Sequence, residues 1–489
     1  MPDTTPINYD LQHDELVAKI VAEHAKADLV TLKEIWAYLE GSEQQLLAVI
    51  NNQIPAANLP GNIEFGPILY LLNNDVLRKH PVLKEILRAL GMPYTKITSG
   101  QWNGLVSSAE HGPGLVVGDG TLYSTMLYGQ LDYHWAMAVL SFVYHYYISK
   151  KKAPFGTNPA NVTVDPSKDK VTIAVFGDWG TGPWVDGIYE SPAMLVAKAI
   201  NTITPKPDIS IHLGDVYYSG SSAEELHNLL PKFPAGTLLD KQGNSFSFTM
   251  NSNHEMYDGA FGFFEKALSN PLFNIQNNTS YFVINFQDWV LVGLDSAYYD
   301  PSFFVMQGGI DAGQQAFVKG LNIPADKKVI VFTHHTAITT DGSAINNDKN
   351  KDGSFNPNNL FTEVVAAFNN RNPDFWYYGH THNGIVYNDK SVTQNYTTAF
   401  GRHPEMRCMG HAAIPFGNGY DLYDAAGNPI AAVDYYAHTC LPDPNKQQGK
   451  RVLNGFALLT LWKGKITETA FEVYPDGAIK QVWSKTSSF

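Results

Sequence analysis

Two similar stretches of sequence decide the fold: VTIAVFGDWG at Val171–Gly180 and ISIHLGDVYY at Ile209–Tyr218. Each begins with a run of mostly apolar residues and reaches a Gly-Asp pair. Continuous apolar runs are typical of strands that are buried on both faces. We therefore predict two strands of an α/β sheet, with Asp178 and Asp215 just beyond their carboxyl ends, where such sheets place their ligands.

The same pattern recurs four more times toward the C-terminus. The further apolar runs are Phe246–Met250, Trp289–Leu294, Val329–Phe332 and Phe375–Tyr378. The polar residues that follow them are Asn253-His254-Glu255, Asp295, His334-His335 and Gly379-His380-Thr381-His382. A turn role is expected for Asp295. A hairpin is predicted for Gly455–Trp462 with Ile466–Val473.

Six of these polar side chains have the chemistry of metal ligands: Asp178, Asp215, Asn253, His334, His380 and His382. A lone aspartate after a strand is usually a cap or a turn residue, so no single cluster is decisive. Taken together, the set offers a carboxylate that can bridge two ions and imidazoles that suit zinc and iron. Two ions roughly 3.5–4 Å apart can clamp a phosphate, and they lower the pKa of bound water so that hydroxide forms near neutral pH.

Five motifs, in this order and spacing, resemble those of the calcineurin-like metallophosphoesterases. They are GDWG at 177–180, GDVYY at 214–218, SNHE at 252–255, THH at 333–335 and GHTH at 379–382. The first two look most like those of the purple acid phosphatases, because Gly180 stands where other subfamilies carry a histidine and Tyr218 lies three residues after Asp215. The resemblance implies an α+β or α/β fold, a four-layer αββα sandwich, over residues 165–489.

The resemblance also implies ligands for two ions. Fe(III) would be held by Asp178, Tyr218 and His382, a divalent Fe, Zn or Mn ion by Asn253, His334 and His380, and Asp215 would bridge the two. Tyr218 has an ordinary alternative as a strand-end aromatic residue, as has Tyr217.

His254 and Glu255 would form the catalytic pair on the same resemblance. His254 would protonate the leaving group or stabilise charge there, since the pKa of imidazole is near the working range, and Glu255 would orient it. Two positions depart from the family pattern. Ser252 replaces a glycine, so that turn is either strained or different, and Thr336 replaces a proline, which leaves His335 as an alternative to His334.

The implied activity is hydrolysis of small phosphate esters by a metal-bound hydroxide, with phosphomonoesters, as for an acid phosphatase, as the expected substrates. A phosphodiesterase, a nucleotide hydrolase and a protein phosphatase are alternatives on the same core. A binding or scaffold protein with a degenerate metal site is the alternative of another class.

Two further groups of residues are weaker candidates. Arg402, His403 and His411 follow the last metal motif and could line a phosphate pocket, or could simply belong to a polar loop. Asp348, Asn350 and Asp352 match the opening of a calcium loop, DKNKDG. The glutamate expected at the twelfth position of such a loop is Asn359, so a hydrated surface loop is the alternative.

Residues 1–160 are predicted to form a mainly helical N-terminal domain of unknown role, ahead of a linker at Pro154–Ser167. The apolar segment Trp135–Ile148 is expected to be a buried helix rather than a membrane-surface helix, because it is short. We expect no membrane partner.

The composition excludes a strongly basic nucleic-acid binder, because 34 Lys and Arg face 47 Asp and Glu, a net charge of −13. Cys408 and Cys440 are too few for a disulfide framework, and two reduced thiols or one bridge are both open. No secretory signal is visible, so we expect a cytoplasmic protein, although a chain whose leader had been removed would look the same.

Overall fold

A computed structural model describes residues 136–489 except 303–304, 339–359, 370, 389–403, 415–431 and 443–449. It also describes isolated positions nearer the N-terminus: 7, 9, 12, 15, 16, 18, 19, 128 and 134. Arg402 and His403 lie outside the described residues, as do the calcium candidates Asp348, Asn350 and Asp352. Most of the predicted N-terminal domain also lies outside them.

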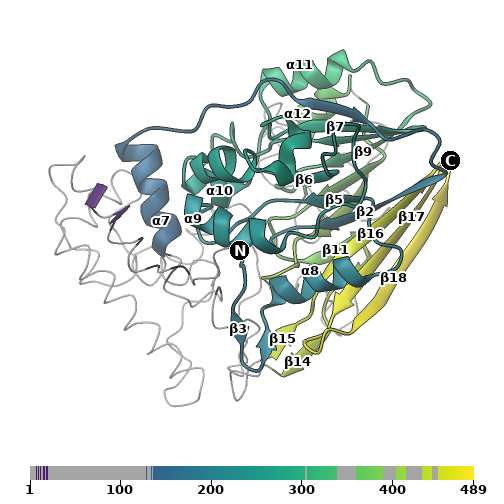
Figure 1. Ribbon diagram of the computed structural model, residues 1–489. Coiled ribbons are helices and arrows are strands. Elements are labelled where there is room, and N and C mark those ends of the chain that lie inside the picture. Colours follow the sequence, from purple (N-terminus) through teal and green to yellow (C-terminus); the bar gives the residue numbers. More distant parts are fainter. Residues whose placement is uncertain are drawn as a thin grey trace.

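The first sheet has the order β18-β17-β16-β2-β5-β6. Its strands are β2 (Lys170–Phe176), β5 (Ile209–His212), β6 (Ser247–Thr249), β16 (Asn454–Trp462), β17 (Lys465–Val473) and β18 (Ile479–Ser488). β2, β5 and β6 run parallel, and β16, β17 and β18 add an antiparallel meander to the edge of β2. The predicted C-terminal hairpin is confirmed as β16 and β17 (Figure 1).

The second sheet has the order β1-β7-β8-β9-β10-β12-β11-β13. Its strands are β1 (Ala160–Thr163), β7 (Phe282–Phe286), β8 (Trp289–Gly293), β9 (Lys328–Phe332), β10 (Phe375–Tyr378), β11 (Gly384–Tyr387), β12 (Glu405–Met409) and β13 (Val433–Tyr436). The central strands β8, β9, β10 and β12 are parallel.

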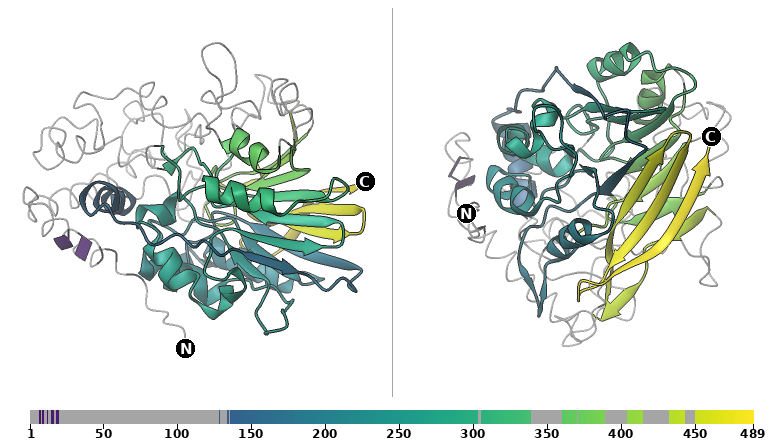
Figure 2. Two further views of the ribbon diagram at one scale, coloured as in Figure 1. Left: turned by 90° about the horizontal axis from the view of Figure 1, so that it is seen from above. Right: turned by 45° about the vertical axis from the view of Figure 1, so that its right-hand side comes forward.

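The two sheets pack face to face with helices outside, so the predicted four-layer αββα sandwich is confirmed (Figure 2). Strand β2 shows why its sequence is apolar throughout. Ile173 and Val175 enter the core between the sheets, whereas Ala174 and Phe176 face the opposite way, into the core beneath helix α8 (Pro192–Thr202). Helices α11 (Ala312–Gly320) and α12 (Leu360–Ala367) cover the other sheet.

The carboxyl ends of the parallel strands carry the polar motifs, as predicted. Asp178 and Asp215 follow β2 and β5, and His380 and His382 follow β10. All four have positive φ angles, between 53° and 76°. This left-handed conformation is uncommon outside glycine and is often found at functional sites. The chain turns sharply at each strand end and presents the side chain at the edge of the sheet.

Described residues from the N-terminal region share a core with the sandwich. Leu16 and Tyr128 belong to the same buried cluster as Phe142 and Tyr218. The apolar segment at 135–148 includes helix α7 (Ala136–Val143) and a π-helical turn, η4 (Tyr144–Ile148). Its described side chains at Met137, Phe142 and Tyr144 are buried, in agreement with the prediction of a buried helix.

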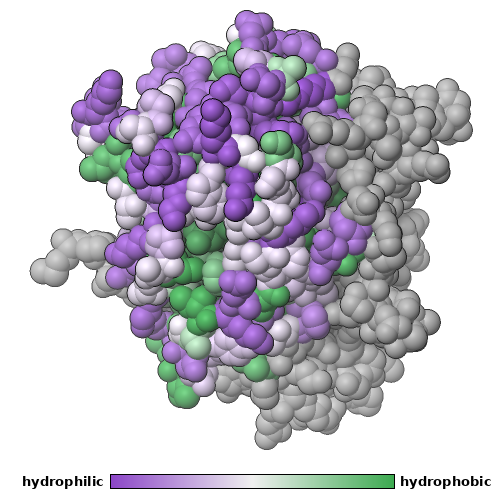
Figure 3. Space-filling view, turned by 90° about the vertical axis from the view of Figure 1, so that its right-hand side faces the viewer, coloured by the Kyte–Doolittle hydropathy of each residue, from purple (hydrophilic) through white to green (hydrophobic). Residues whose placement is uncertain are grey.

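Two observations describe the outside of the molecule. One face is mostly hydrophilic, with some apolar residues gathered near its middle (Figure 3). Among the described residues, no helix combines the length and the apolar character needed to cross a bilayer.

Candidate metal centre

The first group of potential ligands consists of Asp178, Asp215 and His382, all buried. His382 Nε2 lies 3.3 Å from Asp178 Oδ1 and 3.6 Å from Asp215 Oδ2. The backbone N–H of His380 lies 3.0 Å from both carboxylate oxygens of Asp178 and donates to them. The loop after β10 therefore fixes the carboxylate that follows β2, and it brings the two sheets together at this edge.

A tyrosine hydroxyl completes this group, and it belongs to Tyr217. The hydroxyl donates to Asp215 Oδ2 at 2.8 Å and lies 2.9 Å from His382 Nε2 and 3.4 Å from Asp178 Oδ1. The ring of Tyr218, the residue selected by the family resemblance, stacks on Tyr128 with 4.6 Å between centroids. The structure thus brings to the carboxylates the tyrosine that the sequence comparison passed over.

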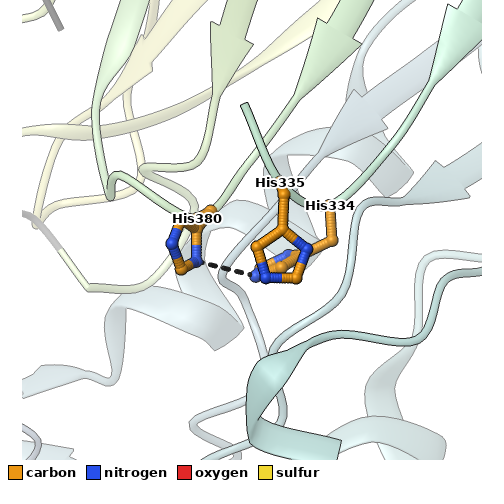
Figure 4. A group of neighbouring side chains, drawn as sticks. All are labelled: His334, His335 and His380. Carbon is orange, nitrogen blue, oxygen red and sulfur yellow. Dashed lines mark hydrogen bonds between the residues drawn. The ribbon is translucent and has the colours of Figure 1, made fainter. Parts of the chain in front are cut away.

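The second group consists of Asn253, His334 and His380. His334 Nδ1 donates to the carbonyl of Leu213 at 2.9 Å. Burial lowers the pKa of His334 to about 3, so the ring is neutral and its Nε2 carries a lone pair. That Nε2 lies 2.7 Å from Asn253 Oδ1 and 3.2 Å from His380 Nδ1 (Figure 4).

The orientation of the Asn253 amide makes this second group a candidate cation site. Its Nδ2 donates to the Tyr257 hydroxyl at 2.8 Å, which turns Oδ1 toward His334. Two lone pairs therefore face each other across 2.7 Å. This contact is repulsive alone and becomes favourable when a cation lies among the donors, and imidazole with amide oxygen suits a divalent transition metal.

Asp215 lies between the two groups. Its Oδ1 is 3.2 Å from His334 Nε2, and its Oδ2 faces His382 and Tyr217. Burial and the charge of Asp215 raise the pKa of Asp178 well above its usual value. For Asp215, burial acts in the same direction, but His334 and His254 outweigh it and hold the pKa well below the usual value. Two buried carboxylates that face each other are costly unless cations compensate them, so the donors present fit metal ions.

His254 lies at the rim of the centre, on helix α10 (Asn253–Tyr257), and is 6% exposed. Its Nδ1 donates to the carbonyl of Tyr218 at 2.6 Å. This bond directs Nε2 toward Asp215, 3.8 Å from Oδ2. Burial lowers the pKa of His254, against the opposing effect of the Asp215 charge.

Ser252 and Glu255 differ from expectation in their contacts. Ser252 has a φ of −135°, so serine in place of the family's glycine causes no backbone strain. Its hydroxyl contacts Asp215 Oδ1 and Glu255 Oε2, and it accepts the backbone N–H of His254 at 3.0 Å. In these contacts the Glu255 carboxylate meets Ser252, whereas the atom that orients His254 is the carbonyl of Tyr218.

His335 is close to the centre, but both of its ring nitrogens already have partners. Nδ1 lies 2.9 Å from Ser296 Oγ, and Nε2 lies 2.7 Å from the carbonyl of Val305. Its ring is 4.7 Å from that of His380, so it forms a wall beside the second group (Figure 4). The geometry favours His334 over His335 as the ligand.

His411 and Cys408 support the GHTH loop from below. The ring of His411 is buried, and a Cβ on Gly384 would come within 2.4 Å of it, which indicates a packing role. Cys408 is a free, buried thiol. Its Sγ donates to the carbonyl of Asn383 at 3.0 Å and lies 3.1 Å from Thr381 Oγ1.

Residues 171–384 match the calcineurin-like phosphoesterase family model. No curated protein sequence matches the chain.

Three of the solved structures that match the chain are compared with it by TM-score, identity and coverage. A structure of PhoD has a TM-score of 0.37 and 10% identity, over 69% of this chain and 71% of that chain. Vacuolar protein sorting 29 from Cryptosporidium parvum has a TM-score of 0.27 and 12% identity, over 66% of this chain and 100% of that chain. A putative 5'-nucleotidase from Staphylococcus aureus has a TM-score of 0.28 and 11% identity, over 65% of this chain and 54% of that chain. Because all three TM-scores are below 0.5, none of these similarities assigns a function.

The family match rests on the part of the chain that carries the strand-end motifs. It covers the parallel strands β2, β5, β6, β8, β9 and β10 and the residues of both ligand groups. The match to residues 171–384, together with the αββα sandwich, supports placing this region of the chain in the metallophosphoesterase superfamily.

Proposed function

We propose that residues 165–489 form a dinuclear metal-dependent phosphoesterase that hydrolyses small phosphomonoesters, of the type of the purple acid phosphatases. The observation that carries the proposal is the position of Asp215. One of its carboxylate oxygens faces the donors Asp178 and His382, and the other faces His334. A carboxylate shared between two donor groups is the arrangement that two neighbouring ions require.

The proposed ligands divide between two ions. Asp178, His382 and a tyrosine would hold Fe(III), Asn253, His334 and His380 would hold a divalent Fe, Zn or Mn ion, and Asp215 would bridge them. Such ions supply a nucleophile near neutral pH and stabilise the charge that develops on the phosphoryl oxygens. The two aspartates account for two of the negative charges in the net −13, and the ions would neutralise them, so a phosphate anion would meet a less negative site than the composition indicates.

His254 is the proposed general acid. Because its Nδ1 proton is committed to the Tyr218 carbonyl, Nε2 is the atom that can carry a proton to the leaving group. Ser252 and Glu255 hold the start of helix α10, on which both Asn253 and His254 lie. The Ser252 contacts thus connect the proposed acid with the shared carboxylate.

The test is a comparison of wild type with Asp215→Asn, each incubated with iron and with zinc or manganese. We expect the wild type to hydrolyse phosphomonoesters faster than diesters, and the variant to lose on the order of 10³-fold in kcat/KM, which is about 4 kcal/mol of transition-state stabilisation. The metal content of the variant should fall with its activity.

Asp208→Asn serves as the control, because Asp208 immediately precedes β5 and accepts the backbone N–H of Thr172, at the opposite end of the strands from the motifs. Both variants should keep the circular dichroism spectrum of the wild type. Full activity in Asp215→Asn would disprove the shared-carboxylate arrangement. A strong preference for diesters would be consistent with the proposed metal centre but would contradict phosphomonoesters as the substrate class.

A further inference from the structure

The first ligand group has the spacing of atoms that surround one ion. At metal–ligand distances near 2.1 Å, adjacent ligand atoms lie about 3.0 Å apart in an octahedron and about 3.4 Å apart in a tetrahedron. The Tyr217 hydroxyl lies 2.8, 2.9 and 3.4 Å from Asp215 Oδ2, His382 Nε2 and Asp178 Oδ1. His382 Nε2 is 3.3 and 3.6 Å from the two carboxylates. All five separations fit atoms around a single centre.

We propose that Tyr217, rather than the tyrosine three residues after Asp215, supplies the phenolate ligand of the first ion. The inference rests on the proposed dinuclear centre and deepens it. On binding, the phenol O–H bond breaks and an oxygen–metal bond forms, and the proton leaves to solvent. No redox change accompanies this step.

Gly180 explains how the Tyr217 backbone comes close enough. A Cβ at Gly180 would lie 2.6 Å from both the carbonyl oxygen of Asp215 and the Cα of Val216. The two segments form a parallel bridge, in which the N–H of Tyr217 donates to the Gly180 carbonyl at 2.9 Å. Gly180, which stands where other subfamilies carry a histidine, thus allows the close approach of the backbone that carries Tyr217.

Other contacts hold the two tyrosines in separate environments. Asn228 Nδ2 donates to the carbonyl of Tyr217 at 2.9 Å and fixes its backbone from the far side. Tyr218 lies in an aromatic group with Tyr9 at 5.1 Å and Tyr128 at 4.6 Å between ring centroids. Tyr218 contacts the centre through its carbonyl, which accepts the proton of His254 Nδ1.

Tyr217→Phe and Tyr218→Phe form a matched pair for the test. Iron-loaded full-length protein is examined for the visible phenolate-to-Fe(III) charge-transfer band and for bound metal per chain. A second measurement titrates the metal-free protein with Ga(III) and follows the ultraviolet difference signal of tyrosinate. We expect Tyr217→Phe to lose both signals and to bind the first ion at least tenfold more weakly, on the scale known for altered metal sites. Tyr218→Phe should keep both signals.

The outcomes separate this inference from the proposed function. Signals that persist in Tyr217→Phe and vanish in Tyr218→Phe would overturn it. A wild type that binds two ions and hydrolyses esters without any tyrosinate signal would also overturn it, while the proposed function would stand. A wild type that binds no metal would end both. Thermal melts of the two variants check that each change leaves the fold intact.

Discussion

The two halves of the candidate centre differ in charge. The first half offers two carboxylates, a phenol and one imidazole, and the second offers an amide oxygen and two imidazoles. An anionic oxygen-rich set favours a highly charged ion, whereas neutral imidazoles suit a divalent one. In the proposed centre, Asp215 would therefore be shared by two ions whose surroundings differ in charge.

The halves also have different structural origins. The first half depends mostly on the strands of the six-stranded sheet, since Asp178 follows β2 and Asp215 follows β5. In the second half, His334 and His380 follow β9 and β10 of the other sheet. The centre therefore requires the strand ends of both sheets to meet at one edge (Figure 1). The bond from the His380 backbone to Asp178 provides that connection.

The largest expected effect comes from removing one ligand from each half. Asp178→Asn should lose the first ion, and His380→Ala should lose only the second, so that bound metal falls from two ions to one in each case. Activity should fall about 10⁴-fold in both, because neither ion alone clamps the phosphate. Metal analysis of dialysed protein, with iron and zinc counted separately, measures the result.

One result with this pair of variants would contradict the proposed difference between the two halves. If Asp178→Asn and His380→Ala lose the same metal, the two halves do not select ions independently. His411→Ala is the control, because His411 is a buried histidine that packs beneath the loop without a partner in either ligand group.

The sequence identified the candidate ligands that the structure brings together, but it could not distinguish between the two adjacent tyrosines. Apolar runs and the polar residues after them identified the strand ends, and the parallel order of the strands brought these ends together. The choice between Tyr217 and Tyr218 depends on the turn after β5 and on the close approach of Gly180. Neither is visible in residue spacing.

Contacts between residues distant in sequence were beyond prediction for the same reason. The hydroxyl of Ser252 reaches Asp215, 37 residues earlier, only because β5 and the start of α10 meet at the same edge. Tyr128 stacks on Tyr218 although the intervening chain carries no motif that indicates it. Periodicity describes which face of an element is buried, and it says nothing about the element that covers that face.

The pH dependence of the reaction rate should reveal the proposed general acid, His254, which lies beside the first half. Burial lowers the pKa of His254 below its usual value. A general acid must be protonated, so the reaction should slow as the pH rises through this lowered pKa. The effect should be strong for alkyl phosphates and weak for aryl phosphates, whose leaving groups need no proton.

His254→Gln should abolish this limb of the pH profile and reduce kcat for alkyl phosphates about 10²-fold. Metal content should not change, because His254 is not a proposed ligand. Steady-state rates across pH for both substrate types provide the measurement. An unchanged alkyl phosphate profile in the variant would show that another group protonates the product.

The smallest effect is expected from Ser252→Ala. The variant removes the hydroxyl that contacts Asp215 Oδ1 and leaves a backbone that any residue adopts. Loss of a hydrogen bond to a ligand typically weakens metal binding about 10–100-fold. The helix cap at the His254 N–H is lost as well, at about 1 kcal/mol of stability.

Titration of the metal-free variant with each ion would then sharpen the comparison of the halves. Because Oδ1 of Asp215 faces His334, loss of the Ser252 hydroxyl should weaken binding mainly of the second ion if the carboxylate is rigid. Equal weakening of both ions would instead mean that Asp215 pivots as one unit. Ser219→Ala is the matched control, since its hydroxyl donates at 3.1 Å to Glu224, a buried carboxylate outside both ligand groups. Equal loss of affinity in Ser219→Ala would contradict a specific role for Ser252, because it would attribute the effect to the loss of any buried hydroxyl in this region.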